Sequence, residues 1–205
     1  MAALAHGRPK ISSSAATRFG YSTSTRTRIA WTWCLIRKKS DWCYGPNSKN
    51  AYSQGIKIEP DFLERSGYRL PTEAEWECAC RAGAVTSRTY GGSVALLGKY
   101  SWYSQNSQDR AWPCGQVKPN DLGLFDLLGN VYEWCQDQLG SSPANDYAIA
   151  QLMANGSMVR EKDPGLFRGG AFTDHAANVR SAYRNWVQPW NRSNNLGFRL
   201  ARTCP

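Results

Sequence analysis

Two carboxylates, Asp126 and Glu133, lie seven residues apart with a Gly129-Asn130 turn between them. A tight turn exposes backbone carbonyl groups, and hard cations such as calcium bind carboxylate and carbonyl oxygens together. The same spacing also fits carboxylates that accept hydrogen bonds from the N–H groups of a turn. The spacing alone favours turn capping, and a cation site is the alternative.

His175, one of two histidines, follows Asp174 directly. Such a pair could act as a metal ligand or general base whose ring is oriented by the carboxylate. One histidine does not complete a typical metal site, and no second histidine follows at a metal-binding spacing. We therefore interpret His175 as a partly exposed loop residue, and it stays the one catalytic candidate.

The cysteines are odd in number and contain no C-x-x-C pair, which excludes zinc-ribbon and thioredoxin-like sites. We expect most of them to be buried thiols that pack as small hydrophobes. They are Cys34, Cys43, Cys78, Cys80, Cys114, Cys135 and Cys204.

The last forty residues, 166–205, carry six arginines, no lysine and one acid, Asp174. Arginine, amide and large aromatic side chains are typical of surfaces that recognise polar or carboxylate ligands and peptides. Structural arginines that brace loops are the alternative, and we assign that role to Arg180, Arg184 and Arg199. The predicted ligand-binding residues are Trp186, Gln188, Trp190 and Asn191.

One helix is predicted directly after Pro71. Thr72 is a good N-cap, and Glu75 three residues later completes a capping box. Arg81 suits the negative end of the helix dipole, and Gly83 is placed to terminate the helix. The face expected to pack on the core carries Ala74, Cys78 and Ala82.

Beyond this helix, Gly, Pro and Asn recur every few residues up to Asn130, which predicts short strands and long ordered loops. Strands are expected at 167–172 and 196–201, with polar chain between them. The pattern indicates an α+β domain with little regular secondary structure.

The formal net charge of +9 arises almost wholly from residues 1–40, which hold eight Lys/Arg and no acid. Residues 41–205 hold the other seventeen basic groups against all sixteen acids, so no nucleic-acid partner is expected. The longest apolar run, Ile29–Ile36, is too short to span a bilayer. We interpret 1–40 as a basic leader, disordered or from a mis-set gene start, and assign no compartment.

Three ordered segments resemble the formylglycine-generating enzyme (sulfatase-modifying factor) family. They are Gly67–Glu77, Asn120–Trp134, and Arg168-Gly169-Gly170 through Arg180–Arg184 to Gly197–Leu200. The resemblance implies a C-type-lectin-like fold over 41–205. Because residues 1–40 do not match the family, the domain is expected to be incomplete at its N-terminus.

The resemblance also implies calcium bound by Asp126, Gly129, Val131 and Glu133. Active relatives oxidise a sulfatase cysteine to formylglycine with copper held by two cysteines after the Gly-Gly strand, and 169–180 contains none. We therefore expect no copper and a relative that binds a protein or small polar ligand through 172–195. The alternative is an oxidoreductase that converts a sulfatase cysteine to formylglycine.

Overall fold

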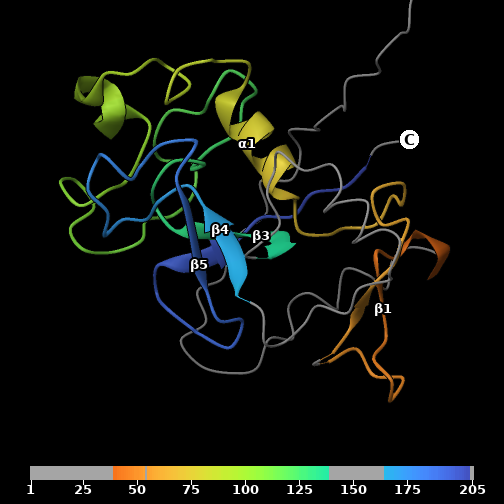
Figure 1. Ribbon diagram of the computed structural model, residues 1–205. Helices are drawn as coiled ribbons and strands as arrows, with labels where there is room; N and C mark the ends of the chain where they lie inside the picture. The colour runs from red at the N-terminus through yellow and green to blue at the C-terminus, as the bar shows by residue number, and fades with distance from the viewer. Residues whose placement is uncertain (1–38, 54, 139–163, 204–205) are drawn as a thin grey trace, which may run out of the picture.

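The structure is a computed structural model that describes residues 39–53, 55–138 and 164–203 (Figure 1). Short elements alternate with long loops. In chain order they are the 3-10 helix η2 (Lys39–Asp41), β1 (Tyr44–Gly45), β2 (Lys57–Ile58), α1 (Glu73–Arg81), the 3-10 helix η3 (Val94–Lys99), β3 (Tyr132–Gln138), β4 (Gly165–Arg168), β5 (Arg184–Val187) and β6 (Leu196–Phe198).

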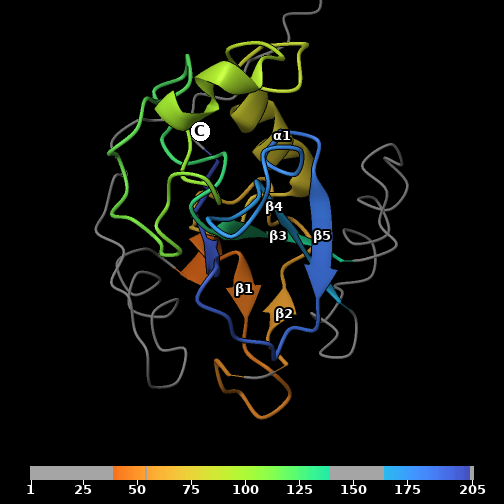
Figure 2. The same ribbon diagram turned by 90° about the vertical axis from the view of Figure 1, so that its left-hand side faces the viewer.

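The main sheet has the strand order β5-β4-β3-β6. β4 pairs antiparallel with both β3 and β5, whereas β6 pairs parallel with β3. Strands are present at both ends of the C-terminal unit, as expected, but their bounds differ from the prediction. β4 shares only Phe167 and Arg168 with the predicted strand 167–172, because the chain turns at Gly169 and Gly170, and β6 ends at Phe198 instead of Ala201. β5, which lies in the polar chain between them, was not predicted. Strands β1 and β2 form a separate antiparallel pair, seen below the main sheet in Figure 2.

The ends of α1 follow from local sequence. The Thr72 hydroxyl accepts a hydrogen bond from Glu75 N at 3.2 Å, and Glu75 Oε2 accepts one from Thr72 N at 2.9 Å, so the capping box is confirmed. The helix ends one residue earlier than expected, at Ala82, which adopts the left-handed conformation with φ 50°.

The face of α1 that packs on the core differs from the expected one. Ala74 and Cys78 are exposed, while Glu73, Trp76, Ala79 and Cys80 are buried. The prediction counted only small apolar residues. Burial of the large Trp76 side chain and pairing of Glu73 with arginines of the sheet together determine the orientation of the helix.

The main core lies between α1 and one face of the sheet. Trp76 and Cys80 of the helix pack there with Leu166 of β4, with Leu97 of η3 and with the loop residue Leu128. A second cluster covers the opposite face of the sheet, built on Tyr132, Phe167 and Ala171. A third, smaller cluster lies under β1 and β2 and contains Cys43, Ile58 and Phe62.

The chain between α1 and β3 forms loops that lie on one side of the molecule, opposite β1 and β2 (Figure 1). Asn120 holds them to the helix, since its amide donates to Ala79 O at 2.7 Å. The Asn130 side chain accepts from Trp112 N and donates to Trp112 O. The described residues form one α-helix, short 3-10 helices, small sheets and long loops. This confirms the expected α+β class with little regular secondary structure. Within the described residues, no helix has the length and apolar character needed to cross a membrane.

Candidate functional site

The segment after β4 is a tight turn held by a carboxylate. Gly169 and Gly170 both have positive φ, and a Cβ on Gly169 would lie 2.8 Å from Leu127 O. The chain then turns back, because Ala171 N donates to Asp174 Oδ2 at 2.8 Å. Burial, with the hydrogen bond to Asp174, raises the pKa of the Tyr132 phenol. Tyr132 is therefore a neutral donor to the Asp174 carboxylate.

His175 lies outside this arrangement. Its side chain is exposed, and the carboxylate of Asp174 is directed to Ala171 and Tyr132. The adjacent pair therefore does not form the oriented carboxylate–histidine unit that a general base would need. The structure therefore adds no support for His175 as a catalytic residue.

Cys80 and Cys135 are buried thiols of the core. In the 169–180 segment, Asp174 closes the turn and Val179 is fully buried. Burial raises the pKa of Cys80 to about 12 and that of Cys135 well above its usual value, which disfavours the thiolates that copper prefers. No group of three or more His, Cys, Asp or Glu side chains suited to a metal occurs among the described residues.

The predicted calcium ligands lie close together, but their carboxylates have different environments. Asp126 is buried, its Oδ2 accepts from Gly115 N at 2.8 Å, and its Oδ1 has no partner among the described residues. A buried carboxylate oxygen without a partner fits a cation ligand. Burial, reinforced by the charge of Glu133, raises the pKa of Asp126.

Glu133, in contrast, is already neutralised. Arg199 Nε lies 2.5 Å from Glu133 Oε2, and Arg199 Nη2 lies 2.6 Å from Oε1. Trp76 Nε1 also donates to Glu133 Oε2 at 2.7 Å. A cation at this turn, which would also use carbonyl groups at Gly129 and Val131, has to compete with Arg199 for Glu133. Calcium at these four residues stays a prediction.

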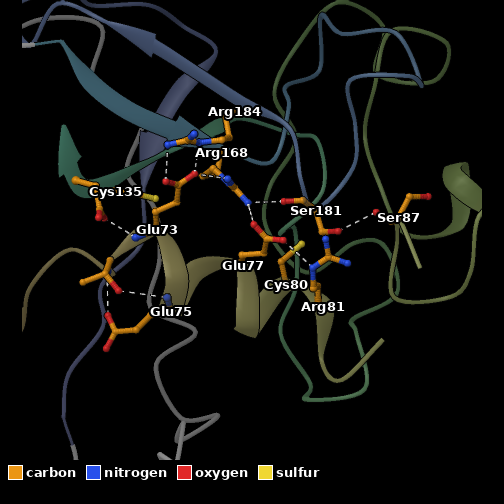
Figure 3. A network of polar contacts seen from close by, with 12 residues as sticks. Glu73, Glu75, Glu77, Cys80, Arg81, Ser87, Cys135, Arg168, Ser181 and Arg184 are labelled. Atoms are coloured by element: carbon orange, nitrogen blue, oxygen red, sulfur yellow. Dashed lines mark hydrogen bonds and ion pairs between the residues drawn. The ribbon is translucent and has the colours of Figure 1, made fainter. Parts of the chain in front are cut away.

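A network of charges, with Glu73 and Arg168 buried at its centre, joins α1 to β4 and β5 (Figure 3). Glu73 is 1% exposed and binds Arg168 of β4, which is also 1% exposed, and Arg184 of β5. Arg168 binds Glu77 as well, and Glu77 accepts from Arg81 at 2.7 Å. The network fixes the position of β5 relative to the helix.

The four predicted ligand-binding residues lie together at the end of β5 and in the turn that follows it. Trp186 is 51% exposed and Trp190 is 62% exposed. Asn191 N donates to Gln188 O at 2.9 Å, which closes the turn between the two tryptophans. Gln188 Oε1 is buried without a partner among the described residues. Two large apolar side chains in solvent within five residues form a candidate recognition surface.

Sequence reasoning missed the arginine–glutamate network that supports this surface. Arg184 was assigned a structural role, which its ion pair with Glu73 agrees with, but its partner was not identified. The helix was predicted from Thr72 and Glu75 at its start, and no partner was expected for Glu73. The only sequence signal was glutamates in the predicted helix and arginines in the C-terminal unit, which does not specify pairing.

The geometry thus defines an α+β domain in which one helix and a buried charge network hold a small sheet with an aromatic edge. The chain belongs to the sulfatase-modifying factor enzyme 1-like domain family, whose model matches residues 17–204. The match begins before residue 41, at which the sequence analysis started the domain, and residues 17–38 lie outside the described residues.

Two curated relatives illustrate the family. A serine/threonine-protein kinase pkn1 of Chlamydia pneumoniae is 32% identical over 146 residues, which cover 69% of this chain and 22% of the relative. A formylglycine-generating enzyme of Streptomyces coelicolor is 33% identical over 157 residues, covering 66% of this chain and 47% of the enzyme. The chain therefore spans less than half the length of either relative.

A solved structure, Treponema denticola variable protein 1, has the same fold. Its TM-score is 0.62 at 27% sequence identity, and the match covers 79% of this chain and 62% of that chain. Together with the family match, this likeness confirms the expected α+β, C-type-lectin-like fold of the formylglycine-generating enzyme family.

Proposed function

We propose that this chain is a binding member of its family without the cysteine–copper oxidase centre, and that it recognises a protein or small polar ligand through 172–195. The observation that carries the proposal is the pair of exposed side chains, Trp186 and Trp190, on β5 and its following turn. Exposed tryptophans cost solubility, and they are among the side chains that contribute most to binding energy.

The chemistry of the turn after β4 supports the same proposal. The 169–180 segment, from which active relatives are expected to supply two cysteines, contains none here. Within it, Asp174 holds the turn and Tyr132, and Val179 is buried. The described buried thiols, Cys80 and Cys135, have raised pKa values. The scaffold is kept, while the side chains near the family's oxidation site have other uses.

A peptide selection tests the proposal. Peptides are selected from a random phage-displayed library on the immobilised wild-type chain, and their affinities are then measured for the Trp186→Ala/Trp190→Ala double variant. We expect binding to weaken at least about tenfold, with an unchanged thermal unfolding curve because both side chains are exposed. The control is Val85→Ser, which removes an exposed apolar side chain elsewhere. Equal affinity of the double variant would contradict the proposal.

The alternative function is oxidation of a sulfatase cysteine to formylglycine, which the similarity to the Streptomyces coelicolor enzyme favours. It is tested by incubating the copper-treated chain with a cysteine-containing sulfatase peptide under oxygen. We expect no loss of peptide mass. Conversion of the peptide together with stoichiometric copper would reverse the ranking of the two functions.

A further inference from the structure

Strand β5 ends the main sheet among the strands that the structure describes. β4 covers one edge of β5, with Trp186 opposite Leu166 and Asn185 opposite Phe167. In an antiparallel ladder, successive residues direct their backbone groups alternately to the two sides of the strand. Trp186 N donates at 2.8 Å to Asn185 Oδ1, which shows that this amide is not committed to β4.

The Asn185 side chain thus accepts the hydrogen bond of the Trp186 N–H group, which an added strand could use instead. A local amide cap of this kind protects a sheet edge from unspecific pairing while leaving it open to a competing carbonyl group. Exposure alternates along the strand, so Arg184 and Trp186 are exposed while Asn185 and Val187 are half-buried. A two-residue period of exposed side chains matches that of an extended peptide lying alongside.

The segment of chain that contains β5 carries an excess of positive charge. Asp174 is the single acid of residues 164–203, and it is engaged by Ala171 N and Tyr132. Of the six arginines in this range, Arg168, Arg184 and Arg199 form ion pairs with carboxylates of α1 and β3. Arg192 lies in the chain that follows β5 and is exposed. No Asp or Glu occurs between residues 175 and 203.

We propose that the outer edge of β5 binds an extended acidic peptide segment of a protein partner, with an apolar side chain of the peptide against Trp186 and carboxylates near Arg192. The inference rests on the proposed binding function and names the class of its ligand. The backbone edge supplies affinity for an extended chain, the tryptophan supplies apolar contact, and the excess of arginine selects acidic residues.

Three labelled peptides test this, each alternating phenylalanine with one other residue: glutamate, glutamine or lysine. Fluorescence anisotropy measures their binding to the full chain. The glutamate peptide is expected to bind at least about tenfold more tightly than the glutamine peptide, and more weakly at high salt. The lysine peptide is expected not to bind. Methylating alternate backbone nitrogens of the glutamate peptide should abolish binding, because it removes the added-strand hydrogen bonds.

Variants locate the binding. Trp186→Ala and Arg192→Glu should each weaken binding of the glutamate peptide about tenfold. The matched controls are Val85→Ser and Arg110→Glu, which change an exposed apolar and an exposed basic side chain outside 164–203, and they should alter affinity less than about twofold. A glutamate peptide whose binding ignores Trp186→Ala overturns the inference.

The outcomes separate the inference from the proposed function. If the glutamate and glutamine peptides bind equally well and Trp186→Ala weakens both, the proposed preference for acidic peptides is wrong. The proposed binding function of this surface is then retained. If none of the three peptides binds, the inference is also overturned. The phage-library selection then tests separately whether Trp186 and Trp190 form a binding surface. Displacement of the glutamate peptide by a sulfated oligosaccharide at lower concentration than by unlabelled peptide overturns the assignment to a protein partner.

Discussion

Asp126 is a buried carboxylate with a hydrogen bond to only one of its two oxygens among the described residues. Gly115 N satisfies Oδ2, whereas Oδ1 is buried without a partner among the described residues. Burial raises the pKa of this group above its usual value of 3.8, with Glu133 adding to the shift. A group whose pKa is higher in the folded than in the unfolded chain binds more protons when folded. Its contribution to stability therefore declines as pH rises through its two pKa values.

Replacing this carboxylate separates a calcium ligand from a buried turn residue. Without metal, Asp126→Asn should match or exceed the wild-type free energy of unfolding at pH 7, because the amide keeps the bond from Gly115 and bears no charge. If calcium binds here, saturating calcium should raise the wild-type Tm by about 5 °C or more and leave the variant unchanged. Differential scanning calorimetry with calcium or with EGTA measures both effects.

The Arg199–Glu133 ion pair provides the competing outcome. If wild-type Tm is the same in calcium and in EGTA, Arg199 serves as the cation at this turn and the predicted metal site does not exist. Arg199→Gln is the matching control, since loss of the guanidinium should increase calcium affinity if Glu133 is a ligand. A calcium effect retained in Asp126→Asn would show that the ion binds elsewhere.

At the scale of elements, the sequence determined where α1 begins but not which face it buries. Caps depend on residues within one turn, so Thr72 and Glu75 could be read directly. The buried face depends on partners more than ninety residues away, since Arg168 and Arg184 bind Glu73. β5 was missed for a related reason: its residues alternate exposed and half-buried because it is an edge strand, so no apolar pattern marks it.

The C-cap of α1 offers a prediction that tests its local geometry. Ala82 has φ 50° and ψ 34°, a conformation that costs an L-residue roughly 1 kcal/mol and glycine almost nothing. Ala82→Gly should therefore raise the free energy of unfolding by about 0.5 kcal/mol, after the greater freedom of glycine in the unfolded chain is subtracted. Urea unfolding followed by circular dichroism measures the change.

The matched control for this variant is Ala74→Gly. Ala74 is exposed in the first turns of the same helix, where glycine should lower the free energy of unfolding by up to about 1 kcal/mol. The two identical substitutions should thus have opposite signs. If both destabilise the domain, the helix does not end in the left-handed conformation at Ala82.

At the scale of the whole molecule, the sequence indicated long ordered loops but not what holds them together. Trp102 stacks on Trp112, with ring centroids 4.7 Å apart, and so joins two of these loop segments. Arg88 was not singled out, yet it is buried and donates to Val179 O and Ala176 O across the domain. These two Arg88 hydrogen bonds join segments about ninety residues apart, and no local pattern specifies them.

Gly129 lies where three remote segments meet. Its N–H donates to Gly169 O after β4, and the next amide, of Asn130, donates to Trp102 O. Its φ is +70°, and an added Cβ would lie 2.2 Å from both Ser101 Oγ and Trp102 O. Ser101 is fully buried, so neither neighbour can move aside without shifting the loop that it belongs to.

Gly129→Ala should therefore lower the free energy of unfolding by at least about 3 kcal/mol, through a steric clash added to backbone strain. Gly123→Ala isolates the strain, because Gly123 has a similar φ of +76° and open space around its Cβ position. That control should lose only about 1 kcal/mol. Urea unfolding of the two variants measures the difference, or the yield of folded protein if Gly129→Ala does not fold. Equal losses would mean that the Ser101-Trp102 segment moves freely against the turn, so that this junction does not hold the three segments together.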